Sequence, residues 1–112
     1  MVTNDRPPGK TTVAPEVLVT IARLTTLGVT GVNRLATHPG EVNRWFDRGV
    51  SEGVKIEVED GKVYVDVYVI LNRDVNVREV ARNIQAQVAR AITEMVGMDV
   101  GRVNVHIEDI QY

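Results

Sequence analysis

The clearest alternation of apolar and polar residues along the chain lies between Gly53 and Leu71. Two alternating runs flank Asp60-Gly61, a dipeptide typical of the two-residue turn of a β-hairpin. Pairing Glu59 with Lys62 places six apolar side chains on one face, as a half-buried sheet requires. These six are Val54, Ile56, Val58, Val63, Val65 and Val67.

The opposite face of this hairpin is polar and predicts a solvated surface. The same register pairs Lys55 with Asp66, and such opposite charges stabilise neighbouring strands. We therefore interpret Asp66 as the cross-strand partner of Lys55. Glu57 and Glu59 are expected to be exposed to solvent.

A long amphipathic helix is predicted after the hairpin. Asn76 has the position of an N-cap, with Glu79 three residues later as in a capping box, and Gly97 is a natural C-terminal stop. The residues expected on its apolar face recur at helical spacing: Val77, Val80, Ala81, Ile84, Val88, Ala91, Ile92 and Met95. Beyond the helix, Val103, Val105 and Ile107 alternate with Asn104 and His106, which predicts a last strand.

An earlier helix is expected from Pro15 to about Leu27, because proline suits the first helical turn. Gly28 and Gly31 then supply a stop and a turn. The predicted apolar stripe comprises Val17, Leu18, Ile21, Ala22 and Leu24. Residues 10–14 are interpreted as a short strand.

The order of elements is (β)αββαβ and predicts an α+β sandwich. Two helices are expected on one face of a mixed sheet of three or four strands. The strand after the long helix should lie parallel to the strand before it. One domain is expected over residues 10–112, preceded by a disordered tail over residues 1–9.

Residues 33–52 show little regularity, apart from an amphipathic turn after Pro39-Gly40. Val42, Trp45 and Phe46 recur at i, i+3 and i+4, and they include the only Trp and the only Phe of the chain. Large apolar side chains are usually buried, so this group could be a small satellite core. Trp and Phe also carry many protein contacts, so it could be a docking patch.

Composition narrows the possible functions of this 112-residue chain. The absence of cysteine excludes a disulfide scaffold, a thiolate zinc site and a cysteine nucleophile, and it suits a reducing cytoplasm. The net charge of −2 does not favour nucleic-acid binding. No run approaches the roughly 18 apolar residues of a membrane span, and we expect no export signal.

No pattern of residues indicates catalysis. His38 and His106 have no spacing to further metal ligands, and Ser51 lacks the context of a nucleophile elbow. We therefore expect no enzyme activity, no metal and no cofactor. The exposed face of the long helix is a candidate for an oligomer contact, and it carries Glu79, Asn83, Gln87, Arg90 and Glu94.

Gly28-Val29-Thr30-Gly31 matches the Gly-x-x-Gly loop of KH domains, which joins two helices and clamps a nucleic-acid backbone. Arg34, Arg44 and Arg48 follow this loop. An RNA-binding module is therefore the alternative hypothesis. A glycine helix stop explains the same four residues without a ligand.

Several separated motifs resemble the bacterial alkaline shock protein twenty-three family, also called the Gls twenty-four family. The resemblance covers residues 9–110 in the family's order: Gly9-Lys10-Thr11-Thr12-Val13-Ala14-Pro15-Glu16-Val17, Gly28-Val29-Thr30-Gly31-Val32, Gly53-Val54-Lys55-Ile56, Val63-Tyr64-Val65-Asp66-Val67, Val80-Ala81-Arg82-Asn83-Ile84-Gln85, Met95-Val96-Gly97-Met98-Asp99-Val100 and Val103-Asn104-Val105-His106-Ile107. Residues 36–51 depart from the family pattern.

The resemblance implies a scaffold or interaction protein in cell-envelope homeostasis and stress response. It implies a place on the cytoplasmic side of the membrane, held there by a small membrane-anchored protein. We expect protein partners, self-association and no nucleic acid. The residues expected to make these contacts are Val42, Trp45, Phe46, Asn83, Gln87 and Arg90.

The docking interpretation of the aromatic group predicts a specific phenotype for Trp45→Ala. The melting temperature should stay nearly unchanged, while self-association or partner capture should be lost. Arg44, Asp47 and Arg48 would form the polar rim of such a patch. A large loss of thermal stability, with binding retained by the folded fraction, would instead place Trp45 in the core.

Overall fold

The structure is a computed structural model and describes residues 13–36, 50–51 and 53–111. Two helices, α1 (Pro15–Leu27) and α2 (Val77–Val96), accompany five strands. The strands are β1 (Val32–Leu35), β2 (Val50–Ser51), β3 (Val54–Glu59), β4 (Lys62–Asn72) and β5 (Asp99–Gln111). The expected α+β class is confirmed, and β1 and β2 extend the predicted sheet.

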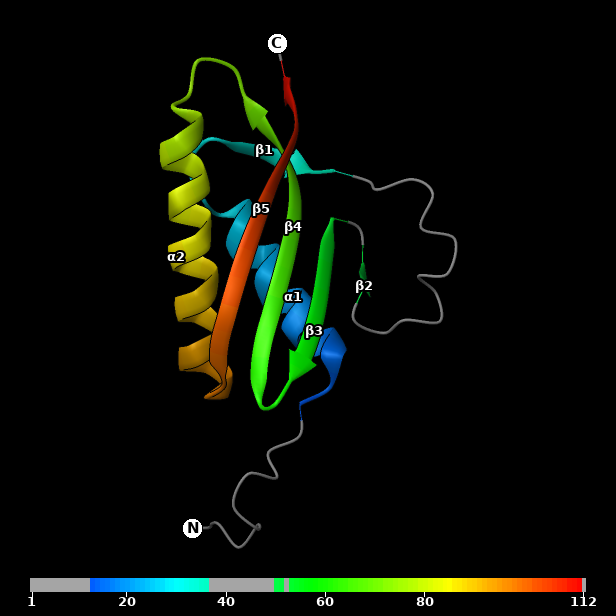
Figure 1. The fold of residues 1–112 in the computed structure, drawn as a ribbon. Coiled ribbons are helices and arrows are strands. Elements are labelled where there is room, and N and C mark those ends of the chain that lie inside the picture. The colour runs from blue at the N-terminus through cyan, green and yellow to red at the C-terminus, as the bar shows by residue number, and fades with distance from the viewer. Residues whose placement is uncertain (1–12, 37–49, 52, 112) are drawn as a thin grey trace, which may run out of the picture.

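β4 is the strand on which the sheet is assembled. β3 and β1 pair antiparallel with successive parts of β4, while β5 pairs parallel with it along its whole length. The sheet is therefore mixed, and the predicted parallel relation between the strands that flank α2 is confirmed. Figure 1 shows α1 behind the strands and α2 alongside β5.

The hairpin of β3 and β4 has the predicted register, with Glu59 opposite Lys62 and Val54 opposite Val67. Five of its six predicted apolar positions are buried, but Val58 is 48% exposed. Val58 lies near the turn, in a part of β3 that the short strand β2 does not reach, because β2 pairs only with Val54 and Lys55. The prediction of burial was therefore wrong at Val58.

α2 has the predicted bounds and the predicted ends. The Asn76 side chain accepts a hydrogen bond from the backbone N–H of Glu79 at 3.0 Å, and Gly97 closes the helix with a φ of 73°. The side chains of Val80, Ile84, Val88 and Ile92 are buried. Val77 and Met95, at the two ends of the predicted stripe, are exposed, so the prediction of burial was wrong at these two residues.

α1 is rotated relative to the predicted stripe. Leu18, Val19 and Ala22 are buried, whereas Val17 is 45% exposed and Leu24 is 57% exposed. The two possible stripes are adjacent on the helix, and contact with both the sheet and α2 selects the one that contains Val19. Sequence periodicity alone does not distinguish them.

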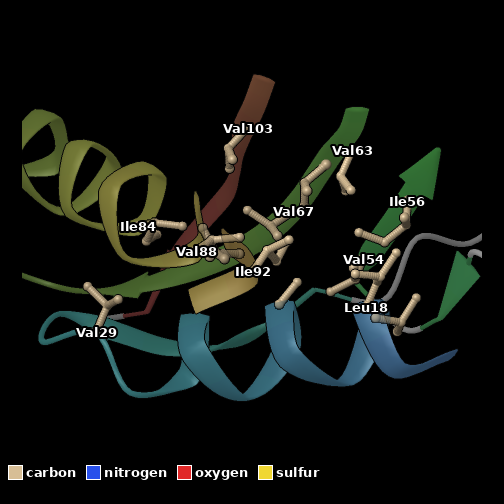
Figure 2. Packing of buried hydrophobic residues seen from close by; sticks show 14 of the residues in the cluster. Leu18, Val29, Val54, Ile56, Val63, Val67, Ile84, Val88, Ile92 and Val103 are labelled. Carbon is tan, nitrogen blue, oxygen red and sulfur yellow. The ribbon is translucent and has the colours of Figure 1, made fainter. Parts of the chain in front are cut away.

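One apolar cluster joins both helices to one face of the sheet. Figure 2 shows Leu18 of α1 and Ile84, Val88 and Ile92 of α2 converging on the valines of β3, β4 and β5. Alternate residues of β4 belong to this cluster, and the residues between them lie on the other face of the sheet. The members from β4 are Val63, Val65, Val67, Val69 and Leu71.

The predicted strand over residues 10–14 is not found in its described part, because Val13 and Ala14 are not in a strand. The rest of that segment, the predicted tail, and Val42, Trp45 and Phe46 lie outside the described residues. In the part of the chain that the structure describes, neither helix is both long enough and apolar enough to cross a membrane.

The buried position of Ile84 predicts a large effect of its truncation. Ile84→Ala should lower the free energy of unfolding by about 2–5 kcal/mol, because it leaves a cavity between α2 and the sheet. Urea denaturation measures this loss. Gln87→Ala, on the exposed side of the same helix, is the matched control and should change stability by less than about 0.5 kcal/mol. A loss at Ile84 as small as that of the control would contradict the packing described above.

Candidate functional site

The face of the sheet opposite the helices carries a group of polar and aromatic side chains that contact one another. Its members come from β4 and β5, between the residues that enter the core. We call this surface the open face and define it by Tyr64, Asp66, Tyr68, Arg102, Asn104 and His106.

The parallel register of β4 and β5 brings these side chains together in pairs. Tyr64 lies opposite Arg102, Asp66 opposite Asn104, and Tyr68 opposite His106. Residues directly opposite each other on neighbouring strands are close enough for their side chains to interact. The composition of the open face therefore depends on the register between β4 and β5. Its hydrogen bonds join residues that lie 38 and 40 positions apart in the chain.

Asp66 is the centre of a hydrogen-bond network on the open face. Its Oδ1 accepts a hydrogen bond from Nδ2 of Asn104 at 3.1 Å and lies 3.0 Å from Nε2 of His106. The predicted cross-strand position of Asp66 opposite Lys55 is confirmed, but the hydrogen bonds of the Asp66 side chain come from β5. Lys55 is opposite Asp66 in the sheet, but its ammonium lies 3.8 Å from a carboxylate oxygen of Glu57.

The surroundings of Asp66 favour its charged form. Burial by itself would raise the pKa of the carboxyl group, but the hydrogen bonds from His106 and Asn104 act in the opposite direction. Electrostatic interactions with His106 and Lys55 act in the same direction as these hydrogen bonds, and the net result is a lowered pKa. Asp66 is therefore a carboxylate held in place by its neighbours.

Aromatic contacts order the rest of the open face. The rings of Tyr68 and His106 stack with centroids 4.4 Å apart and planes 12° from parallel. The Arg102 guanidinium lies 5.4 Å from the centroid of the Tyr64 ring, within the range of a cation–π contact. The Tyr64 ring also lies against the backbone of Gly101, where a Cβ atom would come within 2.5 Å of it.

A second set of polar contacts continues beyond the open face, at the end where β1 joins the sheet. Arg34 of β1 donates hydrogen bonds to Asn33 at 3.1 Å and to Gln111 of β5 at 3.0 Å. Asn33 in turn donates to the side chain of Asn72 at 2.8 Å. These contacts join β1, β4 and β5 through their side chains.

The predicted contact residues of α2 are exposed but do not form one site. Asn83 lines a cavity of about 330 Å³ with Thr30, Gly31 and Asn76. Gln87 and Arg90 line a separate cavity of about 400 Å³, in which Met95 is also a lining residue. Arg90 is paired with Glu94 at 3.0 Å on the same helix. Val42, Trp45 and Phe46, the other predicted contact residues, are outside the described part of the chain.

The Gly-x-x-Gly segment does not have the surroundings of a KH loop. It connects the end of α1 to β1, whereas a KH loop joins two helices. Gly31 has a φ of 100°, and a Cβ at this position would lie 2.7 Å from a methyl group of Val80. Close packing of the turn against α2 explains why glycine is needed there.

Sequence reasoning did not identify Tyr64, Tyr68 and Arg102 as members of a site. Their alternation with the valines of the hairpin and of the last strand was the available signal. Within residues 13–36, 50–51 and 53–111, no group of three or more His, Cys, Asp or Glu side chains is placed to hold a metal ion. The contacts that the open face can offer are hydrogen bonds, charge pairs and aromatic stacking.

Comparison with known proteins gives a match over nearly the whole chain. The model of the alkaline shock protein twenty-three family, described as having a cell envelope-related function, matches residues 3–112. YqhY of Bacillus subtilis is 29% identical over 106 residues, which cover 93% of this chain and 78% of YqhY. Spy1535 of Streptococcus pyogenes is 35% identical over 104 residues, 91% of this chain and 79% of that protein.

Solved structures of the MamM CTD have a similar fold. One variant is 14% identical, covers 84% of this chain and 93% of its own, and superposes with a TM-score of 0.52. Another, described as a nickel form, is 13% identical with the same TM-score and covers 84% of this chain and 96% of its own. At this level of identity the likeness concerns the fold alone.

The lowered pKa of Asp66 predicts a pH-dependent contribution to stability. A carboxyl group whose pKa is lower in the folded state stabilises the fold above its unfolded pKa, about 3.9, and this stabilisation is lost as the pH falls through the folded pKa. Denaturant melts at pH 7 and pH 3 should therefore show a larger difference between the wild type and Asp66→Asn at pH 7. Asp99→Asn, at an exposed carboxylate of β5, is the control. A difference that is unchanged or larger at pH 3 would contradict the network.

Proposed function

The chain belongs to the alkaline shock protein twenty-three family, whose function is related to the cell envelope, and on this basis we propose that it is a non-enzymatic interaction protein in envelope homeostasis and stress response. In this proposal it works by contacts with other proteins on the cytoplasmic side of the membrane. A small membrane-anchored protein is the kind of partner that the family resemblance suggests.

The observation that carries this proposal is that the side chains of the open face hold one another in fixed positions. Tyr and Arg are enriched among the residues that dominate protein interfaces. Here Tyr68 is stacked on His106, and Arg102 lies over Tyr64, so their positions are set before a partner arrives. Fixing a rotamer-rich side chain in advance reduces the entropic cost of binding. Among the described residues, both helices pack against the other face of the sheet.

The charges of the open face indicate the chemistry of the partner surface. Asp66 contributes an anionic centre, and Arg102 contributes a cation beside it on the same strand pair. A complementary surface would present hydrogen-bond donors to Asp66 and a carboxylate to Arg102. A protein segment with both kinds of group fits this requirement better than a polyanion, which would meet Asp66 with like charge.

Partner capture from living cells tests the open face directly. We would cross-link cells that produce the tagged full-length chain and recover complexes from membrane and soluble fractions. Tyr68→Ala should reduce recovery of the membrane-fraction partner by about thirtyfold, because truncation at an interface centre costs ~2 kcal/mol or more. Gln87→Ala, on the exposed side of α2, should leave recovery unchanged.

The reverse result would contradict the proposal. If Gln87→Ala lost the partner and Tyr68→Ala kept it, the exposed face of α2 would be the contact surface. Filter binding with single-stranded RNA at two salt concentrations tests the alternative function. Tight binding that weakens steeply with salt would favour an RNA-binding module over a protein-interaction protein.

A further inference from the structure

Three different chemical groups follow one another along β4 and β5 on the open face. Arg102 supplies a cation, Asp66 supplies a carboxylate, and His106 supplies an aromatic ring. Each of them belongs to a pair of facing residues that lies two positions further along the two strands than the pair before it. Because one residue of a parallel strand rises about 3.3 Å, successive groups are about 6.6 Å apart along the strand direction.

The charged groups of this row keep the capacity for a further contact. Both polar contacts of the Asp66 side chain, with Asn104 and His106, converge on Oδ1. Within the described ranges Oδ2 takes part in no hydrogen bond, and the Asp66 side chain is 28% exposed. Arg102 is exposed and rests on the ring of Tyr64. The side chain of His106 is 41% exposed.

We propose that the open face binds an amphipathic helix of the partner protein, which lies along β4 and β5. The helix presents a carboxylate to Arg102, a basic group to Asp66 and an apolar side chain to His106. These three side chains stand at positions i, i+4 and i+8 of the helix. The inference rests on the proposed interaction function and specifies the segment of the partner that is recognised.

The spacing of the row and the hydrogen-bonding needs of a backbone select a helix. Four residues of α-helix rise about 6 Å, close to the step between successive groups of the row, and positions i, i+4 and i+8 lie within about 80° of the helix circumference. An extended segment has a similar spacing, but on the face of a sheet, away from its edges, its backbone N–H and C=O groups would lack partners. A helix satisfies these groups internally.

The order of the charges gives the bound helix a direction. A Glu placed four residues before a Lys or Arg stabilises a helix more than the reverse order does. The carboxylate that meets Arg102 therefore comes first, and the base that meets Asp66 comes second. The helix then runs in the same direction as β4 and β5, and each charge faces an opposite one across the interface, as electrostatic complementarity requires.

A designed peptide tests this pattern with a defined probe. The peptide is an alanine- and glutamine-based helix that carries Glu, Arg and Leu at successive intervals of four residues. Titration into the isotope-labelled full chain, followed by backbone amide chemical shifts, should give a dissociation constant of roughly 1 mM or below. The shifts should centre on Asp66, Asn104 and His106. A peptide of the same composition with Glu and Arg exchanged should bind at least about tenfold more weakly, because it brings like charges together.

Charge reversal on the protein provides a matched loss and rescue. Arg102→Glu should weaken binding of the peptide with Glu, Arg and Leu by at least about tenfold, and a peptide with Arg in place of its Glu should restore binding to within about threefold. Arg78→Glu makes the same change of net charge at an exposed position of α2 and should leave binding of the first peptide unchanged. Circular dichroism checks that both variants are folded.

Two further peptides test whether the ligand must be a helix. A central proline, which breaks a helix, should abolish binding, and an extended peptide with the same three side chains at every second residue should bind more weakly than the helix. No detectable binding of the helix, equal affinity for the two charge orders, tighter binding of the extended peptide, or shifts centred on α2 would overturn the proposal. If Tyr68→Ala still lost the cellular partner, the proposed function would stand and only this mode of recognition would be excluded.

Discussion

The structure depends on the alternation of side chains along β4. Every second residue from Val63 to Leu71 enters the core, and the residues between them face the opposite side. Because the period of a strand is two, a slip of one residue would turn the valines to solvent and the tyrosines and Asp66 to the helices. The register of β4 with its neighbours therefore determines both the core and the open face.

The pairing of β4 with β5 extends this division to the last strand. α2 leads the chain from the end of β4 to the start of β5, so the two strands run parallel and their core-facing valines meet. The same register stacks Tyr68 on His106 and joins Asp66 to Asn104. In our account, burial on one face supplies stability, while the other face is the one that we propose for recognition. The proposed function in the envelope uses the second of these faces.

Local signals explain which parts of the fold could be predicted. Asp60-Gly61 determines a tight turn, and the alternation on either side of it leaves only one register with a buried face. Asn76 and Gly97 mark the ends of α2 because their capping interactions lie within a few residues. By contrast, the orientation of α1 depends on contacts with α2 and the sheet, so Val17 and Leu24 were expected in the core.

The candidate site was harder to predict because it depends on distant residues. Asp66 had a plausible partner in Lys55 across the hairpin, but its hydrogen bonds come from β5. The register of β5 shifts near Gly101, where a glycine within a strand is a signal of a bulge, and again near Glu108, where the sequence has no such signal. The family resemblance was confirmed by a match over residues 3–112. This match extends over the whole fold and does not identify a particular surface as the functional site.

The most direct test of this account is a threonine scan of β4 from Val63 to Val69, with the free energy of unfolding measured in urea. Threonine keeps the β-branched shape of each valine and replaces a methyl group with a hydroxyl group. We predict an alternating profile, with losses of about 1–3 kcal/mol at Val63, Val65, Val67 and Val69, where the hydroxyl would be buried among apolar groups. Losses at Tyr64 and Tyr68 should be smaller than those at the flanking valines, because these two rings lie outside the apolar core. A profile without this alternation, or one with its maxima at the tyrosines, would contradict the division of β4 into a stabilising face and a recognition face.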